Sequence, residues 1–338
     1  MIASNTYNTL AEAYLEGLRD LLLHGQSVPS VTEPTSPASN FGKADRPAIE
    51  LLGYSFQVNN PYSSLFLSDV RVIRLPYCIG LFLWSIAGSN SVDWLSYYNP
   101  MARQFSDDGI QLCGAFGKRL LAYSDTINQI EAICARLKSD PSTRRALGVI
   151  CTPEDNLAVS HEYPCCIAVQ YFLRDGALNA ITYMRAQQAL MILPFDAFLF
   201  MTLQCLLASR LGVNVGYYKH ISGTFHIYQA EIEYAKQVIS KGATPIQIGR
   251  MQDSETDIVD LLAFEKNLRE ATVDRDMGKL NQMIAEDIRQ DTFCDQAKAI
   301  LLLYSLLILK LQKNLASILE KISPPMRNLV ANYLKVAR

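Results

Sequence analysis

The sequence has 338 residues, of which 49% are hydrophobic and 19% charged, and its formal net charge is −2. This composition predicts a well-filled globular core and excludes an intrinsically disordered chain. Because this charge gives no overall basic surface, we expect no polymeric nucleic acid as a partner. Any small anionic ligand would have to be bound by a few placed cations. The 8 cysteines form no C-x-x-C pair. We therefore expect reduced thiols, a cytoplasmic location and no metal site.

The first half of the chain predicts helices and strands in alternation. Apolar residues at helical spacing predict a helix at 7–24, and the Ser-, Pro- and Gly-rich segment 25–47 predicts a loop. Glycines inside the apolar run 109–120 predict that this backbone lies close to a neighbour. Further helices are expected at 75–87, 93–98 and 124–140, the last capped by Ser124 and Asp125, and strands at 50–58, 146–152, 165–173 and 178–185.

The second half changes character near residue 250. Residues 194–212 are almost wholly apolar and predict a helix that is buried on most sides, followed by strand-like runs in 214–228 and a helix at 229–240. Four amphipathic helical patterns then follow in 253–338. The longest apolar run, 299–309, is too short to span a bilayer, so we expect no membrane association. We therefore divide the chain into a main domain, 1–250, and a helical extension, 251–338.

The strongest chemical pattern lies in residues 160–196. Cys165 follows a proline, and Arg185 comes about twenty residues later, after an Asp-Gly turn between two alternating runs. A cation near a thiol lowers the thiol pKa, and the thiolate is the reactive form. The residues alone thus predict a cysteine nucleophile that an arginine activates.

Four motifs stand between residues 140 and 228. They are P-C-C-I-A-V-Q-Y at 164–171, Y-M-R-A at 183–186, D-P-S-T-R-R at 140–145 and H-I-S-G-T-F-H-I-Y at 220–228. In that order they resemble P-C-H-x-x-x-Q-[FY], Y-Q-R-S, D-P-x-S-R-R and H-x-x-G-D-x-H-x-Y of the family of thymidylate synthases and the related pyrimidine-nucleotide hydroxymethylases. The resemblance covers about residues 7–245. It implies an α+β, three-layer thymidylate synthase-like fold with a mixed β-sheet, to which the C-terminal helical extension is added.

The resemblance also implies a site for a pyrimidine nucleoside monophosphate. Cys165 would add to C6 of the pyrimidine ring, and Arg185 would bind phosphate beside it. Arg144 and Arg145 would bind the phosphate of the partner's nucleotide across the interface of a symmetric homodimer. The remaining family-derived assignments are Arg46 (with Lys43 as a competitor) for the phosphate, His226 and Tyr228 for the sugar, and Cys166 and Asp196 for the base.

Asp196 bears on the identity of the base. P-F-D at 194–196 resembles P-F-N of thymidylate synthases and P-F-D of cytidylate hydroxymethylases. A carboxyl group suits the amino group and unprotonated N3 of cytosine better than an amide does, so the sequence favours CMP or dCMP. An acid in the first turn of helix 194–212 would also be expected without any ligand. Ala186 stands where the family has a phosphate-binding serine, and this change favours a ribonucleotide over a deoxyribonucleotide.

Two departures concern the chemistry. In L-F-L-W-S-I-A-G at 81–88, Leu81 stands where the family's E-L-L-W-F-L-x-G has its essential glutamate, which handles protons at the ring. The positions that resemble the family's folate pocket have also changed, whereas the nucleotide positions are better preserved. The changed positions are Gln188, Ile192, Ala102 and Phe105.

Three functions follow from these observations. The first is a transferase that hydroxymethylates C5 of CMP or dCMP with 5,10-methylenetetrahydrofolate. The second is a folate-independent enzyme that uses Cys165 on a pyrimidine nucleotide. The third is a nucleotide-binding protein without catalysis, whose helical extension engages a partner.

Overall fold

The computed structural model describes residues 5–29, 47–157, 160, 162–251 and 255–336. A mixed sheet of seven strands runs in the order β1-β3-β8-β7-β6-β5, with β2 paired to β3, and β4 and β9 form a separate pair. The strands are β1 (Thr6–Tyr7), β2 (Gln26–Val28), β3 (Ala48–Val58), β4 (Leu65–Leu67), β5 (Leu147–Val149), β6 (Cys166–Arg174), β7 (Ala177–Gln188), β8 (Asn214–Tyr228) and β9 (Thr244–Ile246).

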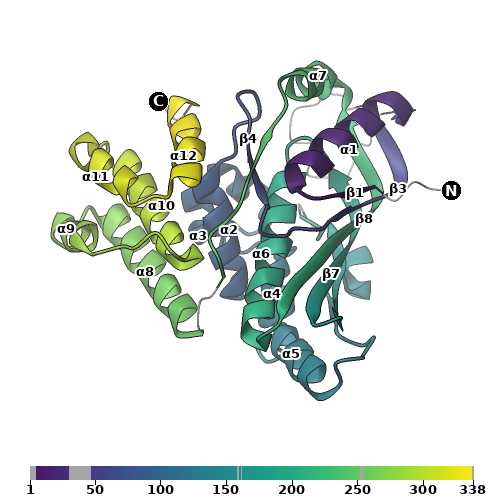
Figure 1. Cartoon of the computed structure of the whole chain (residues 1–338), viewed down its shortest axis with the longest axis horizontal. Coiled ribbons are helices and arrows are strands. Elements are labelled where there is room, and N and C mark those ends of the chain that lie inside the picture. Colours follow the sequence, from purple (N-terminus) through teal and green to yellow (C-terminus); the bar gives the residue numbers. More distant parts are fainter. Residues whose placement is uncertain (1–4, 30–46, 158–159, 161, 252–254, 337–338) are drawn as a thin grey trace.

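The helices lie between and after these strands (Figure 1). They are α1 (Leu10–His24), α2 (Leu75–Ile86), α3 (Val92–Tyr98), α4 (Phe116–Leu121), α5 (Gln129–Ser139), α6 (Leu193–Leu211), α7 (Ile232–Lys241), α8 (Glu255–Asp274), α9 (Met277–Ala285), α10 (Phe293–Ile308), α11 (Leu315–Glu320) and α12 (Pro324–Val336). Short 3-10 turns are η2 (Pro100–Phe105), η3 (Pro153–Asn156), η4 (Gln229–Glu231) and η5 (Gln312–Asn314).

The centre of the sheet is formed by β6, β7 and β8. β6 and β7 pair antiparallel through a two-residue turn in which Asp175 and Gly176 both have positive φ, 51° and 73°. This is the conformation that an Asp-Gly hairpin turn requires, as the sequence predicts. β7 and β8 are parallel, and β3 and β8 are antiparallel, which makes the sheet mixed. The predicted α+β class with a mixed sheet is confirmed.

The core is layered, with α6 at its centre. α6 packs against β7 and β8, and α2 packs against α6 on the side away from the sheet. Residues Leu193–Ala208 of α6 are all buried, as their almost wholly apolar character predicts. Pro194 lies in the first turn, and Gly212 ends the helix in the left-handed conformation with φ 66°. The helix thus brings its N-terminal turn, which contains Asp196, next to the C-terminal end of β7.

The close backbone approach that the glycines predict occurs at Gly117 in α4. A Cβ built there would lie 2.1 Å from the carbonyl oxygen of Ser85 in α2, so only glycine allows α4 to pack at this distance. The predicted helical cap at Ser124 and Asp125 is wrong. Both residues have positive φ, and the side chain of Asn128 caps α5 by accepting from the backbone N–H of Glu131 at 3.0 Å.

Among residues 255–336, the described portion of this last part, there are five α-helices, one more than the four predicted patterns. Lys310 has a φ of 58°, so α10 ends there and the third pattern is divided into α10 and α11. α8 and α10 pack on each other, and α10 packs on α2. Figure 1 shows α8–α12 gathered beside α2 and α3, with the sheet on the other side of the molecule.

Polar contacts tie these helices to the preceding part of the chain. The Tyr98 hydroxyl donates to Glu265 Oε1 at 2.8 Å, and the carboxylate of Glu265 is fully buried beside Arg269. The amide of Asn332 donates to the carbonyl oxygen of Ser68 at 2.7 Å. Within the residues described here, no helix is long and apolar enough to cross a membrane.

Candidate active site

Cys165 and Arg185 lie together at the ends of β6 and β7. The backbone N–H of Arg185 donates to the Cys165 carbonyl oxygen at 2.8 Å, and its Nη2 lies 3.9 Å from Cys165 Sγ. Nε donates to the carbonyl oxygen of Pro164 at 3.0 Å. These contacts hold the guanidinium beside the thiol, as the spacing across the hairpin predicts.

Two opposing effects act on the Cys165 thiol. Desolvation is the larger effect and raises the pKa of Cys165 to about 11, while the charge of Arg185 lowers it. The carboxyl groups of Asp196 and Glu162 act in the same direction as burial. Arg185 therefore favours the thiolate as the sequence predicts, but in the ligand-free protein burial outweighs it and the thiol form predominates at neutral pH.

His226 and Tyr228 alternate along β8, so both side chains lie on one face of the sheet with ring centroids 5.9 Å apart. His226 Nδ1 is buried and has no hydrogen-bond partner among the described residues. Burial, with a smaller effect of the Arg185 charge, lowers the pKa of His226, so its imidazole is neutral near pH 7. A neutral ring with an unpaired nitrogen is suited to bind a hydroxyl group.

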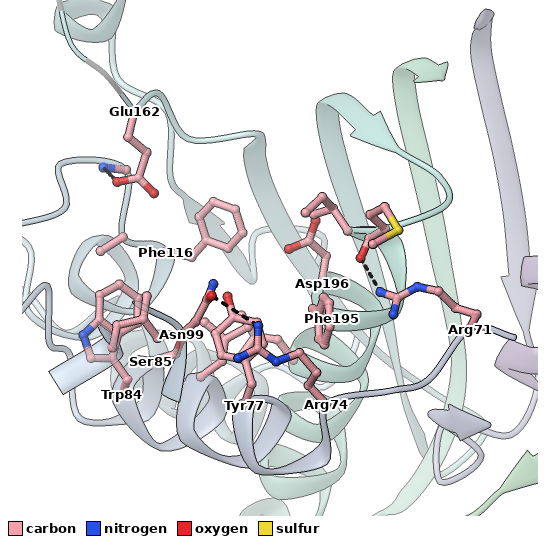
Figure 2. A pocket seen from close by; sticks show the side chains of 17 residues that line it. Arg71, Arg74, Tyr77, Trp84, Ser85, Asn99, Phe116, Glu162, Phe195 and Asp196 are labelled. Atoms are coloured by element: carbon pink, nitrogen blue, oxygen red, sulfur yellow. Dashed lines mark hydrogen bonds between the residues drawn. The ribbon is translucent and has the colours of Figure 1, made fainter. Parts of the chain in front are cut away.

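A cavity of about 290 Å³ lies between α2, the start of α6 and the segments at residues 114–116 and 162 (Figure 2). Its walls are largely apolar and aromatic, and a few polar groups point into it. The lining residues used below are Arg71, Arg74, Tyr77, Leu81, Trp84, Asn99, Gly114, Phe116, Glu162, Ile192, Phe195 and Asp196.

Asp196 is the acid at the α6 end of this cavity. Its side chain is buried, and Oδ2 accepts a hydrogen bond from Gln187 Nε2 at 3.0 Å. No described residue donates to Oδ1. Burial raises the pKa of Asp196 to about 7, with only partial opposition from Gln187. The carboxyl group is therefore partly protonated near neutral pH, and one oxygen remains for a ligand.

Glu162 is a second acid on the cavity wall. Its Oε2 accepts from the backbone N–H of Gly114 at 3.1 Å. Desolvation raises the pKa of Glu162 to about 7, against the lowering effect of that hydrogen bond and of Arg119. In Figure 2, Glu162 and Asp196 enter the cavity from different sides, with Phe116 between them.

On the α2 side of the cavity the two arginines are hydrogen-bonded within the protein, whereas the buried Oγ of Ser85 has no partner among the described residues. Arg71 donates to three backbone carbonyl oxygens, those of Leu190, Val72 and Met191, at 3.2, 2.8 and 2.8 Å. Arg74 donates to the carbonyl oxygen of Tyr98 at 3.1 Å and to the side chain of Asn99 at 3.4 Å. Leu81 adds only apolar surface.

The side chain of Gln188 is likewise hydrogen-bonded within the protein. Its Oε1 accepts from the backbone N–H groups of Met191 and Ile192, at 2.5 and 3.1 Å, and Nε2 donates to Glu231. Ile192 lines the cavity and is 46% exposed, Ala102 is buried, and Phe105 is exposed at the surface. The positions that depart from the family's folate pocket thus hold structural or apolar side chains.

Other predicted site residues are more distant from the cavity. Arg144 and Arg145 are exposed, have no side-chain partner among the described residues, and line a surface hollow together with Arg136. Cys166 is fully buried, and its Sγ contacts the carbonyl oxygen of Ala168 at 3.4 Å. Arg46 and its competitor Lys43 lie outside the described residues. Within the part of the chain that is described, no group of three or more His, Cys, Asp and Glu residues is placed to hold a metal ion.

The sequence did not identify Glu162, Gln187 or Arg71 as parts of the site. Glu162 lies in the same stretch as Cys165, but outside any regular element, so no periodicity indicated the side to which it points. Gln187 follows Arg185 by two residues, and only the contact across to α6 shows that it orients Asp196. Arg71 lies in a segment between β4 and α2 for which the sequence made no prediction.

The fold and the paired cysteine and arginine define the class of protein to which the chain belongs. The sequence profile of the family described as thymidylate synthase matches residues 14–269, which is most of the chain. The protein therefore belongs to the thymidylate synthase family, and the resemblance drawn from its motifs is confirmed.

Individual relatives match shorter segments. The deoxyuridylate hydroxymethyltransferase of Bacillus phage SP01 is 33% identical over 192 residues, which cover 53% of this chain and 50% of that protein. The thymidylate synthase of Listeria monocytogenes serotype 4a is 30% identical over 129 residues, covering 38% of this chain and 40% of that protein. The thymidylate synthase of Listeria innocua is 30% identical over 119 residues, which cover 35% of this chain and 37% of that protein. The chain spans at most about half the length of these relatives.

Proposed function

We propose that the protein is a transferase that hydroxymethylates C5 of a cytosine nucleotide, CMP or dCMP. The observation that carries this proposal is Asp196, a buried acid with one free oxygen at the end of the cavity, whose charge reaches the thiol of Cys165. The phage relative is described as a deoxyuridylate hydroxymethyltransferase, which supports transfer of a hydroxymethyl group and leaves the choice of base to this chain's own residues.

The base preference follows from the hydrogen bond between Gln187 and Asp196. Gln187 Nε2 donates to Oδ2, so Oδ1 is the atom left to meet the base. Oδ1 of a carboxyl group accepts the N4 amino proton of cytosine. In an asparagine at this position the carbonyl oxygen would take the bond from Gln187, and the amide nitrogen would face the base as a donor, which suits O4 of uracil.

The rest of the nucleotide would be bound at the sheet ends. Arg185 lies beside Cys165, and its charge reaches the neutral ring of His226. We assign Arg185 to the phosphate and His226, together with Tyr228, to a sugar hydroxyl. Cys165 would form a bond from Sγ to C6 of the ring, which makes C5 nucleophilic. Cys166 is enclosed behind this surface, and we assign it a packing role beneath the base.

The one-carbon unit would be supplied by 5,10-methylenetetrahydrofolate when that co-substrate is bound. Trp84, Tyr77 and Phe195 provide aromatic walls on which a flat heterocycle can stack. Arg71 and Arg74 place positive charge at the same cavity, although both are already hydrogen-bonded within the protein. The aromatic walls fit the ring of the co-substrate, and the two arginines suit its carboxylates.

We also propose that the protein is a homodimer whose Arg144 and Arg145 reach the partner's nucleotide. The two arginines are exposed and unpaired among the described residues, so they remain available to a phosphate. Near them, Leu147, Val149 and Ile167 are 42%, 44% and 42% exposed on the edge strand β5 and its neighbour β6. An apolar group of this kind beside unpaired cations is typical of an interaction surface.

A folate-independent reaction at Cys165 is the second candidate. Leu81 favours it, because the cavity wall lacks the carboxylate that the resemblance leads one to expect there. In this case the cavity would hold a different acceptor, or only water. A nucleotide-binding protein without catalysis is the third candidate, favoured by the raised pKa of Cys165.

Tritium release and product analysis separate these candidates. CMP, dCMP, UMP and dUMP, each tritiated at C5, are incubated with the protein with and without methylenetetrahydrofolate, and products are identified by mass spectrometry. We expect tritium release and a 5-hydroxymethyl product from a cytosine nucleotide, with the product dependent on the folate. Release without a folate-dependent product would favour the second candidate, and nucleotide binding without release would favour the third.

The base assignment has its own test. In Asp196→Asn we expect the ratio of kcat/KM for cytosine over uracil nucleotides to fall about tenfold or more, because the amide presents a donor where the amino group needs an acceptor. Glu233→Gln, an exposed change on α7, is the matched control and should leave the ratio unaltered. An unchanged ratio in Asp196→Asn would contradict the base assignment.

A further inference from the structure

The cavity contains both the position that has lost a carboxylate and a carboxylate from elsewhere in the chain. Leu81, on α2, and Glu162, which precedes the Cys165 strand by a few residues, both line it. Glu162 reaches the cavity from a different wall and a different part of the sequence (Figure 2). An acidic group is therefore present in this space, although the position that corresponds to the family's glutamate cannot supply one.

The backbone is arranged to admit Glu162. Gly114 donates its N–H to Oε2 at 3.1 Å, and a Cβ on Gly114 would lie 3.1 Å from Cγ and Cδ of Glu162 and 3.0 Å from the nitrogen of Pro164. A side chain at 114 would therefore crowd both Glu162 and the residue before Cys165. On the other side, the Ser160 hydroxyl accepts from the Glu162 backbone N–H at 3.1 Å. One carboxylate oxygen is thus fixed, and no described residue donates to the other, Oε1.

The charges that face Glu162 allow it to change protonation state near neutral pH. Arg119, from α4, favours the carboxylate, and Asp107 favours the acid. The thiols of Cys113 and Cys165 also lie within electrostatic reach, because the charge of Glu162 raises the pKa of each. The net result of burial and these neighbours is a pKa of about 7, which is suited to a group that both gives and takes a proton.

We propose that Glu162 transfers protons to and from C5 of the bound nucleotide, in place of the glutamate that is absent at Leu81. This inference rests on the proposed function, because it assumes that Cys165 adds to C6. Asp196 is held by Gln187 at the base, and His226 lies at the sheet end of the site. Among the described residues that line the cavity, Glu162 is then the acid left to act on C5.

The simplest step that needs such a group is hydrogen exchange at C5. Cys165 thiolate forms the S–C6 bond, the electron pair of the C5–C6 double bond moves to C5, and C5 takes the proton of the Glu162 carboxylic acid. The Glu162 carboxylate then removes the original hydrogen from C5. The electron pair of that C–H bond restores the double bond, and the S–C6 bond breaks to return the thiolate. One hydrogen is exchanged, and nothing is oxidised or reduced.

The test measures tritium release from 5-tritiated CMP and dCMP in the absence of folate. Glu162→Gln removes the proton-transferring group at nearly constant size, so we expect release to fall about 100-fold or more, while the dissociation constant of the nucleotide changes less than about threefold. Glu154→Gln, an exposed change in the same connection between β5 and β6, is the matched control and should release tritium at the wild-type rate.

Chemical rescue separates proton transfer from a structural role. In Glu162→Ala, added formate should enter the vacated space and restore release about tenfold or more, whereas it should restore nothing in Cys165→Ser. Release by Glu162→Gln within threefold of wild type would overturn the proposal. A loss in Glu162→Gln without rescue of Glu162→Ala would assign Glu162 to positioning and would also overturn it. If the wild-type protein releases tritium only when methylenetetrahydrofolate is present, this inference fails and the proposed function stands. If it releases none with or without the folate, the proposed function fails, and this inference falls with it.

Discussion

The two sides of the candidate site differ in how far their polar atoms are already hydrogen-bonded within the protein. On the nucleotide side, formed by Cys165, Arg185, Asp196 and His226, Oδ1 of Asp196 and Nδ1 of His226 have no partner among the described residues. On the α2 side, the guanidinium of Arg71 is satisfied by three backbone carbonyl oxygens, and Leu81 is apolar.

Unpaired buried polar atoms destabilise a folded protein unless a ligand satisfies them. At Oδ1 of Asp196 and Nδ1 of His226 a ligand therefore gains hydrogen bonds without breaking any in the protein, whereas Arg185 already donates to the carbonyl oxygen of Pro164. On the α2 side a polar ligand would have to displace existing bonds of Arg71 and Arg74, and Ser85 Oγ is the unpaired polar atom there among the described residues. This side therefore contributes chiefly shape and stacking surface. The difference predicts that changes on the nucleotide side affect binding and turnover, whereas changes on the α2 side affect stability.

Among the substitutions that test this difference, Cys165→Ser should have the largest effect, and it should act on turnover. Serine is a far weaker nucleophile in this setting, so we expect turnover and tritium release to fall by about 1000-fold or more with the fold retained. Cys113→Ser, which alters an exposed thiol, is the matched control. Turnover by Cys165→Ser near the wild-type level would remove the basis for the nucleotide side as a catalytic surface.

Asp196 should make the stability of the protein depend on pH. Its pKa is raised from 3.8 to about 7, so below about pH 4 both folded and unfolded states are protonated. As the pH rises to 7 only the unfolded state ionises, so the free energy of unfolding falls, and it levels off above pH 7. The full effect is on the order of 2–4 kcal/mol.

The measurement is urea unfolding of wild type and Asp196→Asn at pH 4, 5.5, 7 and 8.5. Asparagine does not ionise, so the difference in unfolding free energy between the two proteins should change by that amount across the range. Glu162 contributes a slope of the same sign in both proteins and cancels in the difference. A difference that stays constant with pH would show that Asp196 has an ordinary pKa.

Arg71→Gln should have the smallest effect and should act on stability. The substitution leaves some of the three carbonyl oxygens without a donor, so we expect a loss on the order of 1–2 kcal/mol in the free energy of unfolding. The affinity for a nucleotide without folate should stay within about threefold of wild type. A larger loss of nucleotide affinity than of stability would show that the two sides are not separate.

The elements of the fold could be predicted where the pattern of side chains is set by burial. The apolar run of α6 and the alternation in β6 and β7 reflect contacts with a core that surrounds or covers them. The failures have local causes. The cap of α5 depends on backbone conformation at Ser124 and Asp125, and the end of α10 depends on the left-handed conformation of Lys310, inside an apolar pattern that continues.

The site was predictable only where motifs specify it. The pairing of Cys165 with Arg185 follows from strand spacing, whereas the effect of burial on the thiol pKa requires the surrounding atoms. Glu162 and Leu81 are 81 positions apart in the numbering and share one cavity only because α4 and the segment before it bring Gly114 against residue 162. No sequence pattern around either residue indicates that both line the same cavity.

The hydrogen bond between Tyr98 and Glu265 bears on how the molecule can be dissected. A chain ended after residue 250, where the composition changes and where we propose the division between main domain and extension, would lack Glu265 and Asn332. It would leave the Tyr98 hydroxyl and the Ser68 carbonyl oxygen without their partners and uncover the face of α2 that α10 contacts. Because the other face of α2 forms the cavity wall, this truncation would also disturb the cavity, and activity measured on the truncated protein would reflect that disturbance. The helical extension and the cavity wall should accordingly unfold together, as one cooperative unit.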